Sequence, residues 1–317
     1  MPSATVRPYA PEMAPQVAEL IELSLAEGRA REPITHMFAP PERLGVPRAF
    51  EMLTGGEVRA DLSFVAMADG RPVAAVIARG SGDEACWWRI VTAPAHRREG
   101  MASACLSAAE GAARVAGVKT VTTDDPLDSR WKAAGKLLLA AGYELIDPSR
   151  RNMSMGLDMS QWRERPVALA DECELVTFSE ERLDSWTECR NRAFDTDSDP
   201  AWFREHFMSR SDFDPAGWHM ILRDGEVVAI SAGVAGEDSA SPGVVIGGQI
   251  EWVGVLPECR GLKLGEAIVV ACLNYLGGRE VARTVLATQP FRVPAVKLYE
   301  KLGFTTFAAW HKYTKAL

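Results

Sequence analysis

The feature that most constrains the fold of this chain is a strand–turn–helix segment that occurs twice. Residues 249–265 read QIEWVGVLPECRGLKLG, in which an apolar strand ends at a proline and a basic, glycine-containing turn leads into a helical run. Residues 90–102 read IVTAPAHRREGMA and follow the same plan. With unchanged spacing, the matching positions are Pro94, Arg97, Gly100 and Ala102 in the first copy and Pro257, Arg260, Lys263 and Gly265 in the second.

Two further landmarks recur in the same order. The sequence Ala-Ala-Gly-Tyr ends at Tyr143, and Lys-Leu-Gly-Phe ends at Phe304. Upstream, Asp-Gly pairs at 69–70 and 224–225 each lie between two apolar runs, a pattern that predicts a β-hairpin. Three landmarks in one order indicate a tandem duplication of a domain of roughly 150 residues.

Composition fits two soluble domains. The 317 residues are 47% hydrophobic and 25% charged, and each half is long enough to bury a core. No apolar stretch approaches the roughly 20 residues that span a bilayer, and residues 1–12 lack the layout of a signal peptide. Six cysteines without a CxxC pair are typical of cytoplasmic thiols rather than of disulfides or a zinc site. A net charge of −8 argues against nucleic acid as a partner.

Strand and helix patterns alternate around the hairpins, which predicts an α/β fold with a mixed sheet in each half. We expect a first domain over 1–160, closed by a strand at 152–159, and a second domain over 173–317. The expected strands also include 249–255, and the expected helices include 102–116, 130–141, 202–208, 266–276 and 294–302. Two loops, 28–47 and 195–215, are expected to shape the site for the substrate.

These motifs resemble the GNAT superfamily of acetyl-CoA-dependent N-acyltransferases. The family's turn reads Arg/Gln-x-x-Gly-x-Gly/Ala between a strand and a helix. Residues 97–102 match it fully, and residues 260–265 depart from it only at Lys263. The family's later helix ends Leu-Tyr-x-x-x-Gly-Phe, which fits residues 298–304. The resemblance covers nearly the whole chain and implies two tandem GNAT-like domains, each a central mixed β-sheet flanked by helices.

The resemblance implies acetyl-CoA as a cosubstrate and no metal. Backbone N–H groups of the second turn would bind the pyrophosphate with the helix dipole, and those of the bulged strand before it would bind the thioester arm. Gly254 would allow the ligand to approach closely. The implied coenzyme-binding residues are Val253, Gly254, Val255, Arg260, Gly261, Leu262, Lys263, Leu264, Gly265 and Glu266. Their counterparts, for which a solvated basic turn is the alternative, are Thr92, Arg97, Arg98, Glu99, Gly100, Met101 and Ala102.

Tyr299 matches the family's usual general acid, which protonates the departing thiolate. A phenol with a pKa near 10 is protonated at neutral pH, as an acid must be. The alternative is a core tyrosine on an amphipathic helix. The first half has Leu138 at the corresponding place, and leucine donates no proton. We therefore expect catalysis in the second half and a degenerate first half. Arg292 stands where the family commonly has asparagine.

Acetyl transfer to an amine also needs a group that accepts the amine proton. Glu251 and Gln249 alternate on one strand and therefore share a face. Related enzymes use a strand glutamate near here, in one tandem relative at the position of Gln249. Glu251 is the remaining carboxylate and is the expected base, directly or through water, with a structural or substrate-orienting role as the alternative. His219 and His311 are weaker candidates.

The sequence thus predicts an N-acetyltransferase that acts on the primary amine of a small molecule, as a monomer or homodimer without a nucleic-acid or membrane partner. The alternative is a non-catalytic acyl-CoA-binding regulatory protein or scaffold, which the departure at Lys263 supports. The acceptor itself does not follow from the sequence.

Overall fold

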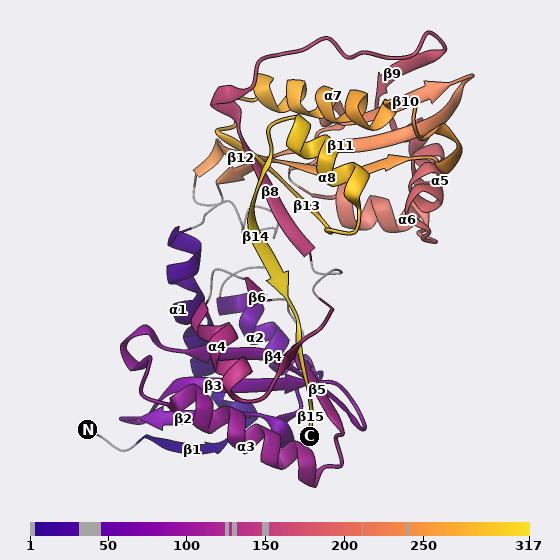
Figure 1. Ribbon diagram of the computed structural model, residues 1–317. Helices are drawn as coiled ribbons and strands as arrows, with labels where there is room; N and C mark the ends of the chain where they lie inside the picture. The colour runs from indigo at the N-terminus through magenta and orange to yellow at the C-terminus, as the bar shows by residue number, and fades with distance from the viewer. Residues whose placement is uncertain are drawn as a thin grey trace. The chain divides into compact units, whose positions relative to one another are not determined.

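The computed structural model describes residues 4–31, 46–123, 127–128, 132–147, 152–210, 212–238 and 241–317. The chain forms two compact units (Figure 1). Unit 1 consists of Met1–Asn152 together with Ala308–Leu317, and unit 2 consists of Met153–Phe307. Each unit has a mixed β-sheet flanked by helices, so the predicted fold class is confirmed. Within the described ranges, no helix combines the length and apolarity that crossing a bilayer requires.

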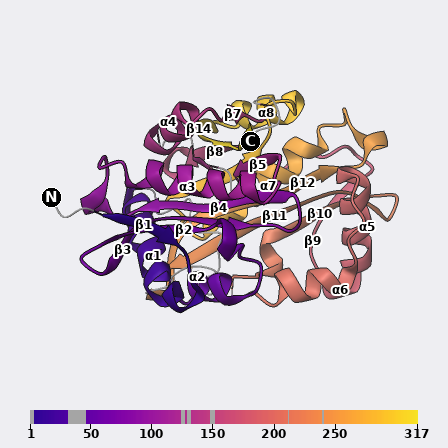
Figure 2. The same cartoon turned by 90° about the horizontal axis from the view of Figure 1, so that it is seen from below.

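Unit 1 is built on a seven-stranded sheet with the order β1-β2-β3-β4-β5-β15-β7. The strands are β1 Thr5–Pro8, β2 Phe64–Ala68, β3 Arg71–Arg79, β4 Glu84–Thr92, β5 Thr120–Thr123, β7 Glu144–Leu145 and β15 Tyr313–Ala316. The helices are α1 Ala14–Arg31, α2 Val46–Thr54, α3 Met101–Val115 and α4 Lys132–Ala140. Figure 2 shows α3 on one side of the strands and α1 and α2 on the other. A separate apolar cluster is buried on each side.

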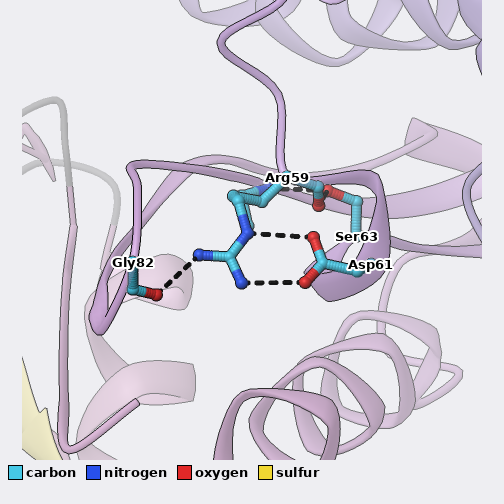
Figure 3. A network of polar contacts seen from close by, with 5 residues as sticks. Arg59, Asp61, Ser63 and Gly82 are labelled. Carbon is cyan, nitrogen blue, oxygen red and sulfur yellow. Dashed lines mark hydrogen bonds and ion pairs between the residues drawn. The ribbon is translucent and has the colours of Figure 1, made fainter. Parts of the chain in front are cut away.

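A polar network fixes the chain where it enters β2. Arg59 donates two hydrogen bonds to the carboxylate of Asp61, of 2.9 and 2.8 Å, and a third of 3.1 Å to the carbonyl of Gly82 (Figure 3). The buried hydroxyl of Ser63 donates to the Arg59 carbonyl and accepts from the N–H of Ala78. The guanidinium keeps the pKa of Asp61 below its usual value, so this pairing holds at neutral pH.

The strands of unit 2 lie in the order β14-β8-β13-β12-β11-β10-β9. They are β8 Asn152–Asp158, β9 Cys173–Thr177, β10 Trp218–Arg223, β11 Glu226–Asp238, β12 Ser241–Val255, β13 Arg283–Thr288 and β14 Thr305–His311. The helices are α5 Leu183–Phe194, α6 Pro200–Phe203, α7 Leu264–Gly278 and α8 Val293–Lys301. In Figure 1, α7 and α6 lie on opposite sides of this sheet. β14 continues into unit 1, where its end pairs with β6 (Leu127–Asp128).

Both predicted hairpins are confirmed. β2 pairs with β3 and β10 pairs with β11, each antiparallel. Asp69 and Gly70 have φ of 50° and 76°, and Asp224 and Gly225 have φ of 51° and 83°. Two consecutive positive φ angles define the tight turn that matches the twist of the flanking strands, and Asp-Gly adopts it at low cost.

The last strand of each half is exchanged relative to our expectation. The strand expected to close the first domain, β8, pairs antiparallel with β13 in unit 2. In unit 1 the position between β5 and β7 is filled by β15, from the end of the chain. The domain limits 1–160 and 173–317 place both strands in the wrong unit. Apolar alternation predicts that a segment is a strand, but the partner depends on contacts distant in sequence.

The two expected substrate loops contain more helix than predicted. α1 extends to Arg31 and α2 begins at Val46, while residues 32–45 lie outside the described part of the chain. In the second loop, α6 is followed by a π-helical turn, Arg204–Met208, instead of one helix over 202–208. Such turns widen the helix locally and are frequent at functional sites.

Thr314→Pro should unfold unit 1 and leave unit 2 folded. Thr314 lies on an inner strand of the sheet, paired with Thr122 on one side and Glu144 on the other. Proline has no N–H to donate to the ladder and is not tolerated on an inner strand. Hydrogen exchange should become fast across β5 and remain slow across β13. Thr314→Val keeps the β-branched shape and serves as the control. Faster exchange in β13 would contradict the exchanged topology.

Candidate active site

Unit 2 contains a wedge between two parallel strands. β12 and β13 pair only at Gly248–Thr284 and Gln249–Val285. β12 then continues to Val255, and no further pair with β13 is present in the described chain. The strands therefore part beyond Gln249, and this edge of β12 presents backbone N–H and C=O groups that need partners.

A bulge lies on β12 within the wedge. Ala232 pairs with Glu251 and Ile230 pairs with Gly254, so the single residue between them on β11 faces two residues of β12. One of these two, Trp252, has φ of 48°. A left-handed backbone is costly for a large aromatic residue and persists only where the surroundings enforce it. The expected bulged strand is therefore present.

The physical reason for Gly254 differs from our expectation. A Cβ atom at this position would lie 3.0 Å from the ring of Phe194, 3.1 Å from Ala193 and 3.2 Å from Ile230. The close approach at Gly254 is thus made by α5 of the protein itself, so it does not require a ligand. The sequence identified the glycine but could not identify what packs against it.

The turn after β12 leaves a row of N–H groups free. Gly261 and Lys263 have φ of 90° and 60°, which turns the chain sharply before α7. The N–H groups of residues 261–265 donate to no backbone carbonyl within the described part of the chain. Unpaired N–H groups at the N-terminus of a long helix suit a phosphate group. Lys263 itself takes the costly left-handed conformation, not a helical one.

The matching turn of unit 1 has the same backbone shape. There Arg98 and Gly100 have φ of 68° and 80°. Each turn therefore contains one glycine and one basic residue in left-handed conformation, at alternate positions. The family motif specifies glycine at only the second of these positions, which is why the second turn departed from it.

Some of the charged side chains around the second turn already bind other groups of the protein. Arg260 donates to the carbonyls of Val255 and Ala193, both at 3.4 Å, which ties the turn to β12 and α5. Glu266 on α7 accepts hydrogen bonds of 2.7 and 2.6 Å from Lys301 of α8. The exposed Lys263 stands at the start of α7.

Glu251 and Gln249 share one face of the sheet, as predicted. The alternate residues of β12 face α7. A Cβ atom at Gly248 would meet Leu276 of α7, and one at Gly233, the partner of Ile250 on β11, would meet Cys272 of α7. Oε2 of Glu251 and Oε1 of Gln249 are buried and have no hydrogen-bond partner in the described structure. This face, away from α7, thus presents two free acceptor oxygens.

An ion pair that we did not predict lies beside Glu251. Arg210 binds the carboxylate of Asp212 through two hydrogen bonds, of 2.8 and 2.6 Å. Burial raises the pKa of Glu251, the positive charge of Arg210 lowers it, and the negative charge of Asp212 raises it. The raised pKa makes the carboxylate a stronger proton acceptor. Asp212 belongs to an acidic, aromatic segment, 195–215, and that composition was the available signal.

Aromatic rings line the same side of β12. The π-helical turn carries Phe207, whose ring lies 4.3 Å from that of Trp252. The guanidinium of Arg210 lies 5.7 Å from the Phe207 ring. Further rings of this cluster belong to Phe203 and Trp218. The left-handed backbone of Trp252 thus turns its indole into an aromatic wall next to Glu251.

Tyr299 lies on the other face, toward α7. It is 5% exposed and packs in the cluster that includes residues of α7, with its ring 6.1 Å from Phe304. Burial raises the pKa of Tyr299 to about 12, although the charge of Arg292 acts to lower it. The phenol is therefore protonated throughout the neutral range. Its counterpart Leu138 is 1% exposed in the core of unit 1.

The bulge separates these two groups. Glu251 and Tyr299 therefore belong to opposite faces of the sheet, and Val253 of the bulged segment contacts the clusters of both faces. A carboxylate on one face and a phenol on the other offer a proton acceptor and a proton donor.

Neither histidine joins this group. His219 lies on β10 opposite residue 231 and meets Tyr275 of α7 edge to face, with 6.4 Å between the ring centroids. Both of its nitrogens are buried and have no partner in the described structure. Burial lowers the pKa of His219 to about 4. His311 belongs to unit 1.

Lys263→Gly should stabilise unit 2 by about 1 kcal/mol, because glycine relieves the left-handed strain of this position. The urea midpoint should rise with an unchanged slope. Gly261→Ala is the matched control, since alanine at φ of 90° introduces the same kind of strain and should lower the midpoint. Equal shifts in one direction would show that left-handed strain does not govern this turn.

His219→Phe should flatten the acid sensitivity of stability. The folded pKa of about 4 lies below the unfolded value near 6.5, so the folded state binds fewer protons between these values. Stability from the neutral imidazole is complete above pH 6.5 and is lost as the pH falls toward 4, by roughly 2 kcal/mol at pH 5. Urea unfolding of parent and variant at pH 7 and pH 5 measures the difference. Parallel pH profiles would contradict the assigned burial.

Comparison with family models gives a match in each half of the chain. Residues 176–304 match the Acetyltransferase (GNAT) family, and residues 59–145 match an Acetyltransferase (GNAT) domain. Among solved structures, a GCN5-related N-acetyltransferase from Sphaerobacter thermophilus has a TM-score of 0.62 at 19% identity, covering 99% of this chain and 95% of that one. A tandem GNAT protein from the clavulanic acid biosynthesis pathway has the same score and identity, covering 99% and 98%. These likenesses concern the fold.

Curated relatives carry the name mycothiol acetyltransferase. The protein from Clavibacter michiganensis is 30% identical over 84% of this chain and 83% of its own length. That from Thermomonospora curvata is 28% identical over 93% and 92%. That from Acidothermus cellulolyticus is 34% identical over 44% of this chain, and the match spans 46% of that relative. With two matching domains and a relative aligned over most of both chains, this protein belongs to the GNAT family of acetyltransferases and contains two such domains in tandem.

Proposed function

We propose that unit 2 transfers an acetyl group from acetyl-CoA to the primary amine of a small molecule. The observation that carries this proposal is the early end of the pairing between β12 and β13, together with Glu251 and Tyr299 on the two faces of the sheet. The acceptor oxygens of Glu251 and Gln249 lack partners on one side, while a protonated phenol lies on the other. This arrangement suits a reaction that removes one proton and delivers another.

The residues of unit 2 fit the coenzyme. The unpaired N–H groups over 261–265 offer donors for a pyrophosphate, and Arg260 and Lys263 add positive charge. The open edge of β12 offers backbone groups for an extended arm and a carbonyl. The proposed contacts are Val253, Gly254, Val255, Arg260, Gly261, Leu262, Lys263, Leu264, Gly265 and Glu266. When bound, the coenzyme supplies a thioester, whose carbonyl carbon the amine attacks.

This proposal assigns each proton transfer to one residue. Glu251 accepts a proton from the amine, directly or through water, and its raised pKa favours that acceptance. N–H groups along the open edge of β12 bind the carbonyl oxygen as it gains negative charge. The Tyr299 hydroxyl donates its proton to sulfur as the C–S bond breaks. Arg210 and Asp212 hold the surroundings of Glu251 polar and fixed.

In this proposal unit 1 has no catalytic role, and its turn is the weaker coenzyme site. Trp88 and Leu138 stand where unit 2 has Glu251 and Tyr299, and both are buried in its cores. Arg97 donates to the carbonyl of Ser24, at 3.2 Å. The turn still has its two left-handed residues, so a second coenzyme could bind at Thr92, Arg97, Arg98, Glu99, Gly100, Met101 and Ala102 without turnover.

The second candidate is a non-catalytic acyl-CoA-binding regulatory protein or scaffold. The strained Lys263 at the coenzyme turn favours it, because the family usually has glycine there. The name of the curated relatives favours the enzyme, and makes an acceptor of the mycothiol acetyltransferase type the first to be tried. Amino sugars, polyamines and amino acids complete the panel.

Tyr299→Phe and Glu251→Gln should each lower amine-dependent thiol release from acetyl-CoA, by about 10²-fold or more for the loss of an acid or base. Coenzyme affinity, measured by calorimetry, should change little in either variant. Arg97→Ala is the control in unit 1 and should leave turnover unchanged. Loss of turnover in Arg97→Ala alone would move the chemistry to unit 1. Coenzyme binding without release for any amine would support the scaffold.

A further inference from the structure

Arg292 occupies the N-cap position of α8, the helix that carries Tyr299. The two residues are seven positions apart, which is close to two helical turns. The family commonly has asparagine at this position, so the arginine adds a charge that the family motif does not require. The proposed function does not require this charge.

The guanidinium of Arg292 lies near two aromatic rings. It is 5.8 Å from the ring of Phe194 and 5.7 Å from that of Phe291. The Phe194 ring in turn packs against β12, because a Cβ atom at Gly254 would lie 3.0 Å from it. A chain of contacts thus leads from the bulged strand through one aromatic ring of α5 to the guanidinium.

The charge of Arg292 is available to a ligand. Within the described part of the chain, the Arg292 side chain contacts aromatic rings and makes no ion pair or hydrogen bond. Its neighbours differ, since Arg260 donates to two backbone carbonyls and Lys301 pairs with Glu266. An aromatic face attracts a cation but leaves its charge uncompensated. The field of Arg292 also reaches the Tyr299 hydroxyl, where it acts to lower the pKa against the effect of burial.

We propose that Arg292 supplies the positive charge that stabilises the coenzyme thiolate as it leaves. This inference rests on the proposed function. The electron pair of the C–S bond passes to sulfur, and the acceptor nitrogen forms the new bond to carbon. Sulfur receives its proton from Tyr299, and Glu251 takes the proton of the amine. Arg292 transfers no proton and acts only through its field.

This role predicts a lowered thiol pKa in the bound product. Coenzyme A should then bind more tightly as the pH rises past that pKa, whereas desulfo-coenzyme A, which has no thiol, should not. The charged or titratable groups that act on Tyr299 are Arg292 and, on α7, Cys272. Burial raises the pKa of Cys272 to about 12, above the range of the experiment. Contributions of Glu251 are common to both ligands and cancel in the comparison.

Calorimetric titrations of both ligands from pH 7 to 9.5 test the proposal without any acceptor. In the parent, the affinity ratio of coenzyme A to desulfo-coenzyme A should rise about tenfold, as one unit of pKa shift requires. Arg292→Gln should abolish most of this rise, and Arg292→Lys, which keeps the charge, should retain part of it. Arg165→Gln removes another guanidinium that stacks on a ring, 4.4 Å from Trp162, and should behave as the parent.

Other outcomes overturn the inference. A ratio that does not rise in the parent shows that the thiolate is not stabilised. Equal weakening of both ligands by Arg292→Gln at every pH assigns the arginine to a phosphate or to the pantetheine arm instead. If the parent binds neither ligand, the proposed function itself fails, which is a different result from either of these.

Discussion

The early end of the pairing between β12 and β13 is the constraint on which the candidate site depends. Two parallel strands that remained paired to their ends would use the backbone groups of β12 internally. Here the ladder stops at Gln249, and the bulge at Trp252 turns the strand so that side chains emerge on both faces. The left-handed tryptophan is tolerated because Phe207 and its neighbours pack around the indole. The opening is therefore maintained by aromatic packing on one side of the sheet.

The electrostatic surroundings differ between the carboxylate on one face of the sheet and the phenol on the other. Burial raises the pKa of both Glu251 and Tyr299, but the consequences differ because one group is to accept a proton and the other to donate one. Each has an arginine near it, Arg210 for the carboxylate and Arg292 for the phenol. In both places the cation is itself in contact with an aromatic ring. Arg210 is also paired with Asp212, whereas the rings near Arg292 leave its charge uncompensated.

Local signals in the sequence predicted the local features well. Asp-Gly in both hairpins fixed the turns, and the helix of Tyr299 followed from its spacing and from the proline and glycine near its ends. Features that depend on distant partners were beyond such reasoning. The strand pattern of β8 does not say which sheet receives it, and Gly254 does not reveal that α5 packs against it. The Arg210–Asp212 pair was missed because its relation to Glu251 exists only after β12 and the segment before β10 have come together.

The exchanged strands affect the order in which the two sheets can be completed during synthesis. Every residue of unit 2 is synthesised before β15, which occupies an inner position in the sheet of unit 1. Unit 1 therefore cannot complete its sheet until the last strand has been synthesised, although most of its residues come first. The half made first is therefore finished last, and until then it exposes the unpaired edges of β5 and β7. A chaperone or protease that acts during translation would find its substrate in the N-terminal half.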